Sequence, residues 1–458
     1  MNTEILSRGC SVTLDEINEL RNILGTKVLT EGENYDAARK VWNGMIDRKP
    51  AVIIQCYNSD DVIQAIKFAR EHNLVVSVKG GGHNVAGNAV CGGGLMIDFS
   101  KMKEIKIDPE KRIATAEPGV LWKEFDAATQ EYLLATTGGT VSDTGIAGLT
   151  LGGGLGYLMA KYGTTSDNLL SVEIVTPGGT LLKADKNNYA DLFWAVRGGG
   201  GNFGIVTKFE YQLHPFGPSV VGGMILYKME QGREVMQFYR DYVQKAPDEL
   251  MSYFGFIVTP DGLPVTAVLP VWIGPVGEAE EHLRPLRSFG TPIADLVSEM
   301  PYTAIQSIID AAAPTGIRRY WKSGHFTDLP DKLINTCLQF TATRPSLFTP
   351  ILFFHVRGAA NKIDPSATAF VYRKDHWDFN LISQWLNPEE DEKNLEWTRD
   401  FWNAVEPFTD GVYVNHLDSD DSLRIANAYG ANFSKLKQIK KKYDPDNFLR
   451  MNNNILPG

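Results

Sequence analysis

The stretch Val78-Lys-Gly-Gly-Gly-His-Asn84 decides the fold of this chain. The residues before it form a β-α-β pattern, because residues 51–56 are a short apolar strand, residues 59–73 have the apolar spacing of a helix, and residues 74–78 are rich in β-branched side chains. A strand that runs directly into a glycine loop leaves backbone amides free to contact a phosphate group. The sequence therefore predicts a phosphate-binding loop at residues 79–84.

Glycine returns in four further clusters, at residues 138–139, 145–148, 152–156 and 198–201. Flexible linkers are polar, whereas these clusters lie between apolar segments. Glycine lets a backbone approach a ligand closely, because no Cβ stands between them. We therefore expect several loops that together hold a large flat or phosphorylated ligand.

The chain has 458 residues, which is too many for one ordinary core, so we expect two domains. Residues 105–108 and 112–117 alternate like a pair of antiparallel strands. The glycine clusters stop before residues 214–218, where we place the first domain boundary. Residues 219–410 contain both strand and helix patterns, which indicates a mixed α/β second domain.

Charge and composition limit the class of protein. The formal net charge is −10, and 43% hydrophobic with 22% charged residues is ordinary for a globular chain. Nucleic acid and anionic membranes are excluded as main partners, because both require a basic surface. The one basic run, Lys435 to Lys442, is predicted to be the solvated face of a helix. Residues 1–10 lack the pattern of a signal peptide and no run of about 18 apolar residues occurs, so we expect a cytoplasmic enzyme.

The cysteines indicate neither a metal centre nor a disulfide framework. Cys10, Cys56, Cys91 and Cys337 are the only four, and no two of them have CxxC spacing. We therefore predict no metal site.

Two features have competing interpretations. Gly199 to Gly204 fits the dinucleotide pattern GxGxxG, which would favour an NAD(P)-dependent reductase. That pattern must open a helix, however, and here it leads into an apparent strand at residues 205–213. His83 is either an ordinary exposed loop histidine or a nucleophilic imidazole beside a cofactor loop, and the residues alone leave both open.

Five motifs together resemble a known family. They are Val78-Lys-Gly-Gly-Gly-His-Asn84, Thr144-Gly-Ile-Ala-Gly-Leu-Thr-Leu-Gly-Gly-Gly-Leu-Gly156, Trp194-Ala-Val-Arg-Gly-Gly-Gly-Gly-Asn-Phe-Gly204, Thr368-Ala-Phe-Val-Tyr-Arg373 and Tyr443-Asp-Pro-Asp-Asn-Phe-Leu-Arg-Met-Asn-Asn-Asn454. In this order they resemble the FAD-linked oxidases of the vanillyl-alcohol-oxidase and p-cresol-methylhydroxylase (PCMH) fold, in the berberine-bridge-enzyme-like branch. The resemblance covers nearly the whole chain.

The resemblance implies an α+β fold with two domains. A discontinuous FAD-binding domain of the PCMH type would comprise residues 1–215 and a C-terminal segment, residues 411–458, that returns to it. Residues 216–410 would form the α/β substrate domain with an antiparallel sheet.

The resemblance also implies a cofactor, FAD, bonded through its 8α-methyl group to His83. Relatives with two flavin bonds have a cysteine where this chain has Val141, so a single covalent bond is expected. Residues 80–84 would wrap the FAD pyrophosphate. The implied cofactor-binding residues are Val78, Lys79, Gly80, Gly81, Gly82, His83, Asn84, Gly87, Gly119, Gly139, Thr140, Thr144, Gly145, Gly148, Gly152, Gly153, Gly154, Ile205, Val206, Asn415, Asn452 and Asn454.

Candidate catalytic residues lie on the strand predicted at residues 376–382. Its period-two alternation places His376, Asp378 and Asn380 on one face and apolar side chains on the other. Solvent exposure is the ordinary explanation of such a polar face. The resemblance instead implies that this strand roofs the flavin, which makes Asp378 a candidate base and Asn380 a candidate substrate-orienting amide.

The resemblance adds further candidates in the tail and near the flavin. Tyr413 in Tyr413-Val-Asn-His416 matches a tail strand whose tyrosine helps to deprotonate the substrate. Tyr372 and Arg373 could support the site electrostatically. Ile146 aligns near the position that controls oxygen access, and a bulky residue there leaves both oxidase and dehydrogenase open.

The implied activity is removal of a hydroxyl or similar proton by Asp378 or Tyr413, with hydride transfer from the adjacent carbon of a small organic substrate to flavin N5. The electron acceptor is O2 or, in the alternative, another carrier. An NAD(P)-dependent reductase and a binding protein without activity remain competing hypotheses. Substrate identity and oligomeric state cannot be read from this sequence.

Overall fold

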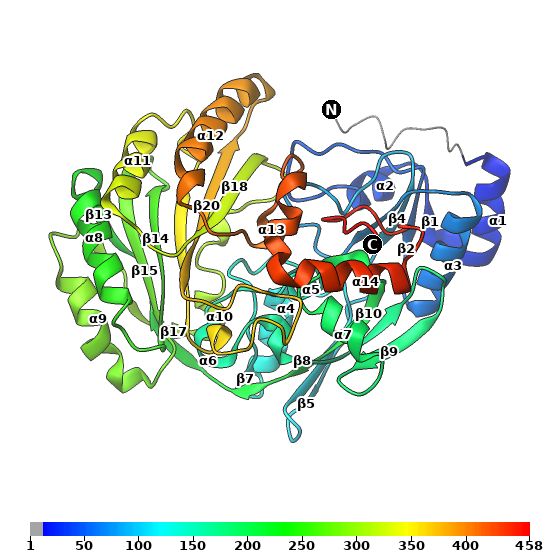
Figure 1. Cartoon of the computed structure of the whole chain (residues 1–458), viewed down its shortest axis with the longest axis horizontal. Coiled ribbons are helices and arrows are strands. Elements are labelled where there is room, and N and C mark those ends of the chain that lie inside the picture. The colour runs from blue at the N-terminus through cyan, green and yellow to red at the C-terminus, as the bar shows by residue number, and fades with distance from the viewer. Residues whose placement is uncertain (1–11) are drawn as a thin grey trace.

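The computed structural model describes residues 12–458, and its strands form four sheets (Figure 1). The first sheet has the order β1-β2-β4-β3, with β1 at Val28–Leu29, β2 at Val52–Gln55, β4 at Leu95–Asp98 and β3 at Val76–Lys79. Strands β2, β4 and β3 are parallel, and helix α3 (Ser59–Glu71) connects β2 to β3. The Asn58 side chain begins this helix by accepting a hydrogen bond from the Asp61 amide. The predicted β-α-β unit is confirmed.

The second sheet has five strands in the order β5-β6-β10-β8-β9. They are β5 (Ile105–Asp108), β6 (Ile113–Ala116), β10 (Ile205–Gln212), β8 (Leu169–Val175) and β9 (Leu181–Asp185). The predicted antiparallel pairing of β5 with β6 is confirmed, with Ile105 opposite Ala116. Gly199 to Gly204 leads into strand β10. The dinucleotide-binding pattern requires a helix at this point, so the structure does not support that interpretation. A two-stranded ribbon pairs β7 (Leu134–Ala135) with β11 (His214–Pro215).

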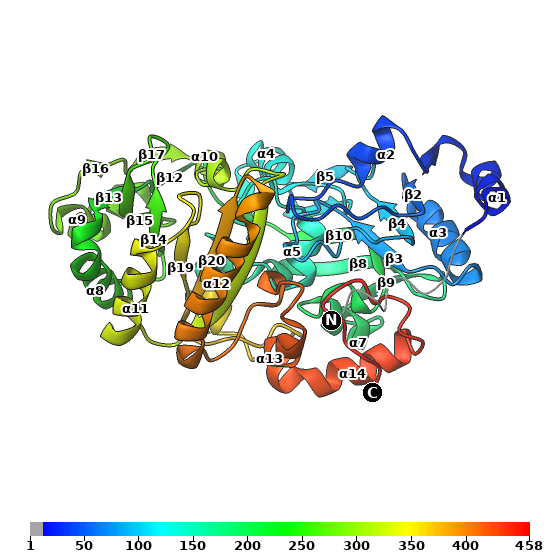
Figure 2. The same ribbon diagram turned by 90° about the horizontal axis from the view of Figure 1, so that it is seen from above.

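The largest sheet is antiparallel and lies within residues 219–385. Its main path is β16-β13-β15-β14-β19-β20-β18, and β12 and β17 pair beside it. The bounds are β12 (Ser219–Gly222), β13 (Ile225–Lys228), β14 (Leu250–Val258), β15 (Pro264–Trp272), β16 (Ala294–Asp295), β17 (Ser298–Pro301), β18 (Arg318–Phe326), β19 (Ile351–Val356) and β20 (His376–Trp385). Helices α8 (Gly232–Val243), α9 (Ala279–Ser288), α11 (Asp331–Ala342) and α12 (Asp391–Val405) cover one face of it (Figure 2).

The remaining helices frame the two smaller sheets. They are α1 (Leu14–Leu24), α2 (Glu33–Ala38), α4 (Trp122–Gln130), α5 (Ile146–Leu151), α6 (Met159–Tyr162), α7 (Ala190–Val196), α10 (Tyr302–Ile305), α13 (Ile425–Tyr429) and α14 (Phe433–Tyr443). One apolar core joins the five-stranded sheet to the inner face of the large sheet and to the C-terminal segment. The predicted domain boundaries, after residues 215 and 410, stay a prediction.

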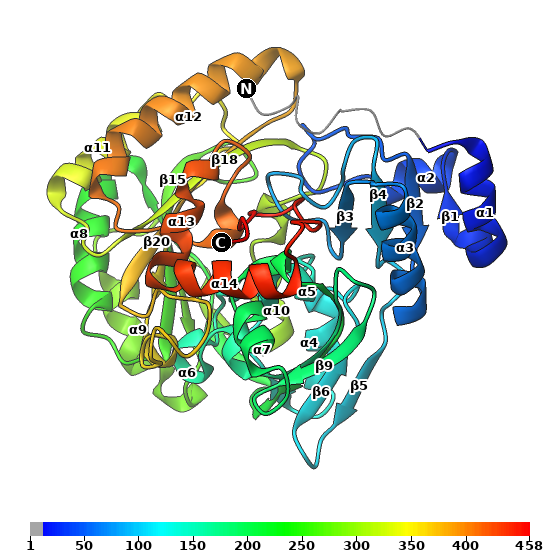
Figure 3. The same cartoon turned by 45° about the vertical axis from the view of Figure 1, so that its right-hand side comes forward.

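The C-terminal segment differs from the prediction in one element. The residues after Gly411 form no strand. Val414–His416 is a single 3₁₀ turn, and only an isolated bridge joins Gly411 to His325 of β18. The expected tail strand is therefore wrong, because this segment bonds to strand β18 through side chains and turns. Helix α14 then packs against α7 (Figure 3). Gly458 at the C-terminus is exposed and donates to the Lys437 carbonyl on α14.

The basic run on α14 is not entirely a solvated face. Lys440 is fully buried, and its ammonium group donates to Asp444, to the Asn202 carbonyl and to the Leu449 carbonyl. The buried Asp444 carboxylate also accepts the backbone amides of Phe448 and Leu449. This pair ties the tail to the glycine loop that precedes β10.

We expect Lys440→Met to destabilise the protein by about 3–5 kcal/mol, because it leaves Asp444 as a buried carboxylate without its cation. Chemical denaturation measures the loss. Lys441→Met is the matched control, since Lys441 is exposed on the same helix and should change stability by less than about 0.5 kcal/mol. Equal stabilities of the two variants would contradict this assignment.

Candidate active site

Two glycine loops meet where β3 ends and α5 begins. A Cβ at Gly81 would overlap the backbone nitrogen of Gly145, and a Cβ at Gly145 would overlap the backbone nitrogen of Gly81. Only glycine fits at either position, whatever its backbone angles. The Ile146 amide donates to the Val120 carbonyl and fixes the start of α5. The two loops therefore form one continuous backbone surface.

A cavity of about 330 Å³ opens on this surface, between the small sheets and the large one. Most of the predicted site residues line it, although they come from distant parts of the sequence. These are Val78, Gly80, Gly81, Gly82, His83, Asn84, Thr140, Thr144, Gly145, Gly148, Ile205, Val206, Asp378, Tyr413, Asn415 and Asn452. Such a size and position, between sheets, suits a small-molecule or cofactor site.

Several predicted residues do not line the cavity. They are Lys79, Gly87, Gly119, Gly139, Gly152, Gly153, Gly154, Asn380 and Asn454. Some of these allow the lining segments to pack, since a Cβ at Gly119 would overlap the Phe99 carbonyl and one at Gly152 would overlap the Asn415 side chain. Lys79 points away and donates to the Ala38 carbonyl.

His83 lies in the cavity wall with an imidazole nitrogen free. Its Nε2 atom is buried and has no hydrogen-bond partner. The ring stacks on Trp42, with 4.3 Å between ring centroids and 20° between ring planes. Burial, with a smaller contribution from the Arg319 charge, lowers the pKa of His83 to about 4. The imidazole is therefore neutral at physiological pH and keeps a lone pair for bonding.

Asp378, on β20, supplies a buried carboxylate at the opposite side of the site. Its side chain lies between two histidines, with His325 Nε2 at 3.6 Å from Oδ1 and His416 Nδ1 at 3.3 Å from Oδ2. Asp378 Oδ1 and both ring nitrogens of His325 have no hydrogen-bond partner. Burial lowers the pKa of His325 well below its usual value, so this histidine is neutral.

The alternation predicted for β20 is confirmed, but neither face is exposed. Trp377 and Phe379 pack in the core between sheet and helices, while Asp378 and Asn380 are buried on the other face. Asn380 donates its amide to Asp378 Oδ2 at 2.9 Å and accepts from Trp321 Nε1. It therefore contacts the carboxylate and does not reach the cavity wall.

The Tyr413 hydroxyl accepts two hydrogen bonds, from the Gly154 amide at 2.8 Å and from the Asn415 amide at 2.7 Å. Burial nevertheless raises the pKa of Tyr413 above its usual range, and these donors only partly oppose the increase. Tyr413 is therefore a neutral hydroxyl at physiological pH.

Sequence reasoning missed three aromatic residues of the wall. Trp321 on β18, Tyr253 on β14 and Phe354 on β19 line the cavity from the large sheet. Tyr253 donates to, or accepts from, Thr140 at 3.1 Å, and its ring stacks on Phe354 at 4.1 Å. No local motif marks these residues, and only the antiparallel pairing of β14, β19 and β20 brings them together.

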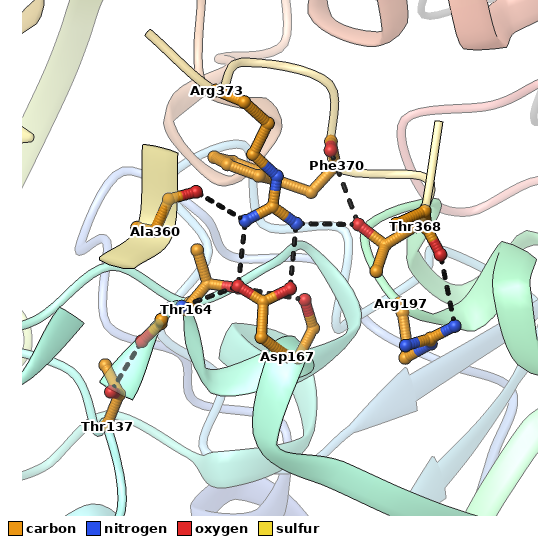
Figure 4. A network of polar contacts seen from close by, with 12 residues as sticks. Thr137, Thr164, Asp167, Arg197, Ala360, Thr368, Phe370 and Arg373 are labelled. Atoms are coloured by element: carbon orange, nitrogen blue, oxygen red, sulfur yellow. Dashed lines mark hydrogen bonds and ion pairs between the residues drawn. The ribbon is translucent and has the colours of Figure 1, made fainter. Parts of the chain in front are cut away.

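Arg373 and Tyr372 lie outside the cavity wall. Arg373 forms a bidentate ion pair with Asp167, both at 2.8 Å, and also donates to the Ala360 carbonyl and the Thr368 hydroxyl (Figure 4). Tyr372 donates to the Asn427 carbonyl. Arg373 thus joins the loop before β20 to the glycine-rich segment before β8, and it has no contact with Asp378.

Three further positions singled out in the sequence have clear locations. Val141 lines the cavity, and Ile146 is fully buried next to the lining residue Ala147. Cys91 is a buried free thiol away from the cavity wall, as predicted, and Cys56 and Cys337 are also free and buried. Cys10 and the first ten residues lie outside the described part of the chain.

Comparison with known proteins identifies the family. An FAD binding domain model matches residues 50–185, and a berberine and berberine-like model matches residues 412–456. An FAD-linked oxidoreductase from Dictyostelium discoideum is 31% identical over 96% of this chain and 97% of its own length. The chain belongs to the berberine-bridge-enzyme-like family of FAD-linked oxidoreductases.

Solved structures agree with this family assignment. The crystal structure of 6-hydroxy-D-nicotine oxidase from Arthrobacter nicotinovorans superimposes with a TM-score of 0.88 at 25% identity, over 95% of this chain and 98% of the other. Chitooligosaccharide oxidase, at 21% identity, gives a TM-score of 0.86 over 97% and 100%, and shows the shared fold. The predicted α+β, PCMH-type fold with an antiparallel substrate-domain sheet is confirmed, and the chain is an FAD-linked oxidoreductase.

The cavity fits FAD on its own chemistry. Backbone amides of two glycine loops meet at one end, apolar and aromatic side chains form the walls, and His83 presents a nitrogen without a partner. Within residues 12–458, no group of three or more His, Cys, Asp or Glu residues has the geometry of a metal site. None of the helices described is both long and apolar enough to cross a membrane.

We expect Gly81→Ala to weaken the noncovalent binding of FAD that precedes attachment by about tenfold or more, so that less of the protein acquires flavin, because the added methyl group forces the two loops apart at a cost of about 1–3 kcal/mol. The ratio of flavin absorbance to protein absorbance after purification reports the loss. Gly92→Ala is the control, since a Cβ there meets nothing within 4 Å. Full flavin content in Gly81→Ala would show that the loops do not form the FAD surface.

Proposed function

We propose that this oxidoreductase carries FAD through a single covalent bond to His83 and oxidises a CH-OH or similar group of a small organic substrate, with O2 as electron acceptor. One observation carries the proposal: a neutral imidazole with a free nitrogen and a buried carboxylate, Asp378, lie on the wall of the same cavity. When bound, FAD accepts a hydride from substrate at N5.

His83 supports the linkage through its protonation state. A nitrogen must be neutral to form a bond to carbon, and the lowered pKa of His83 keeps its lone pair free throughout the physiological range. Val141, and not a cysteine, stands at the position where doubly linked relatives carry their second bond, which supports a single attachment.

Asp378 is the better candidate for the base. Tyr413 has a raised pKa and holds its proton, so it serves as a hydrogen-bond donor that orients the substrate. The Asp378 carboxylate has one oxygen without a hydrogen bond, which leaves that lone pair for the substrate proton. Asn380 donates to the other oxygen and holds the carboxylate in position.

The electron acceptor is inferred from the names of relatives. The named relatives include a hydroxynicotine oxidase and a chitooligosaccharide oxidase, and both names favour O2. A dehydrogenase that uses another carrier is the alternative. Peroxide released in step with substrate consumption supports the oxidase, and its absence under air supports the dehydrogenase.

We expect the wild-type protein to keep its yellow colour in the pellet after acid precipitation, and His83→Ala to lose it to the supernatant. The reason is that acid unfolds the protein and releases flavin that is not covalently bound. His282→Ala is the control, because His282 lies on α9 and stacks on Trp272 away from the cavity. A colourless wild-type pellet would disprove the covalent linkage.

We expect Asp378→Asn to slow flavin reduction by about 10²- to 10⁴-fold while the covalent flavin is retained, because the amide cannot accept the substrate proton. Anaerobic bleaching with 6-hydroxy-D-nicotine and a panel of small alcohols and phenols measures the rate. Asp375→Asn, on the exposed residue just before β20, should reduce the flavin at the wild-type rate. Equal rates in both variants would remove Asp378 from the mechanism.

A further inference from the structure

Arg319, the second residue of β18, is a buried cation without an acidic partner. Its side chain is almost fully inaccessible, and no ion pair joins it to a carboxylate within residues 12–458. Its guanidinium donates to the Gln384 side chain and to backbone carbonyls, including that of Trp42. Burial lowers the pKa of Arg319 only to about 9, so the side chain stays charged at neutral pH. A buried charge costs several kcal/mol unless something compensates it, so its location calls for an explanation.

Trp42 connects this cation to the flavin-anchoring histidine. The Arg319 guanidinium lies 3.7 Å from the Trp42 ring centroid, and His83 stacks on the same ring at 4.3 Å. The Trp42 amide also donates to the carbonyl of Gly82, directly before His83. The three side chains thus form a column from the large sheet to the cavity wall.

Asn43 forms hydrogen bonds with the backbone near both ends of this column, at Val85 and at Arg319. The Asn43 amide donates to the carbonyls of Val85 and Arg319, and its side-chain oxygen accepts the Arg319 amide. A Cβ at Gly44 would overlap the Gly316 carbonyl, so the chain beside it packs backbone against backbone. The geometry of Arg319 relative to His83 is therefore held by backbone bonds as well as by stacking.

We propose that Trp42 and Arg319 are positioning residues for the attachment of FAD to His83: Trp42 fixes the plane of the imidazole, and the Arg319 cation, which contacts the same indole ring, opposes a second positive charge on the imidazole. The inference rests on the proposed covalent linkage and deepens it. Neither residue is named among the cofactor-binding candidates, and Arg319 does not line the cavity.

The attachment step requires only His83, FAD and the O2 that the proposed function already uses as electron acceptor. A bond forms between a nitrogen of His83 and the 8α carbon of FAD, and one C–H bond of that methyl group breaks. Its proton passes to solvent, and its electron pair reduces the flavin ring, which O2 then reoxidises. The imidazole must be neutral at the moment of bond formation, because imidazolium has no lone pair.

The charged groups near His83 determine whether its pKa rises or falls when Arg319 is replaced. Burial is the largest cause of its lowered pKa, the Arg319 charge lowers it further, and Asp143 raises it. Asp143 is paired with Lys123, which weakens its influence. His416 stands behind Trp321, which lies 6.1 Å from Trp42. Removal of the Arg319 charge therefore raises the pKa of His83. As the pH falls, His83 becomes protonated and attachment slows at a higher pH than in the wild type.

The test follows covalent incorporation and needs no substrate. The full chain is produced under riboflavin limitation, FAD is added, and flavin fluorescence in the protein band of a denaturing gel is measured over time at several pH values. We expect Arg319→Gln to shift the acid limb of the rate up by about one pH unit, which slows attachment about twofold near pH 5 and about fivefold near pH 4, with little change near pH 8. Trp42→Leu, which removes the stack, should slow attachment at every pH.

Matched variants separate this role from a structural one. Arg319→Lys keeps the charge and should keep the wild-type acid limb, even if it alters stability. Trp42→Phe keeps a ring and should attach faster than Trp42→Leu. Arg344→Gln is the control, because the Arg344 guanidinium likewise donates to backbone carbonyls but lies beside β14, and it should behave as the wild type.

The outcomes distinguish the inference from the proposed function. Wild-type protein that never acquires acid-stable flavin overturns both. Wild-type attachment with an unchanged acid limb in Arg319→Gln overturns the electrostatic role of Arg319 alone, and a wild-type rate in Trp42→Leu overturns the role of the stack. If Arg319→Gln does not fold, the comparison of Arg319→Lys with Trp42→Leu and Trp42→Phe carries the test.

Discussion

The contact between Gly81 and Gly145 is the constraint on which the site depends. Each residue occupies the space that the Cβ of the other would need, so the loop after β3 and the loop before α5 meet as bare backbone. The first loop belongs to the parallel sheet and the second leads toward the antiparallel sheet. Their contact brings the two loops together along the wall of one cavity, which both of them line. A side chain at either position would separate the sheets that form the cavity wall.

Several buried polar groups without a hydrogen bond belong to residues that line this cavity. Among them are His83 Nε2 and Asp378 Oδ1. Each such group costs about 1–3 kcal/mol relative to a bonded one. A neutral imidazole and a carboxylate on the wall of one cavity form the arrangement expected where a proton and an electron pair leave a substrate.

The features that the sequence predicts correctly are those that depend on residues close together in the chain. The β-α-β unit, the glycine loops and the alternation of residues 376–382 are each encoded within about 25 residues, and the structure confirms them. Asn380 lies on the predicted face, but its side chain bonds to Asp378 on the same strand and to Trp321 on β18, and only the second of these contacts depends on the pairing of β20 with β18. Trp42 and Arg319 are separated by 277 residues, and no motif marks either. The burial of Lys440 differs from the prediction, because the Asn202 carbonyl that it bonds lies 238 residues away, although Asp444 and Leu449 are near it in sequence.

Residues 411–424 of the C-terminal segment form hydrogen bonds with strand β18, which lies at the edge of the large sheet. Gly411 accepts the His325 amide, Asp418 accepts the Trp321 amide, and Arg424 donates to the Ser323 carbonyl. The buried Lys322 ammonium forms one ion pair with the buried Asp421 and a second with the exposed Asp420.

Side chains and turns thus satisfy an edge that would otherwise be open to pairing with another strand. The same segment carries Tyr413 and His416 to the cavity. A regular tail strand would satisfy the edge equally well, but its alternation would direct every second side chain away from β20. The 3₁₀ turn at Val414–His416 instead lets both Tyr413 and His416 lie on the cavity wall, so the irregular tail is a requirement of the site.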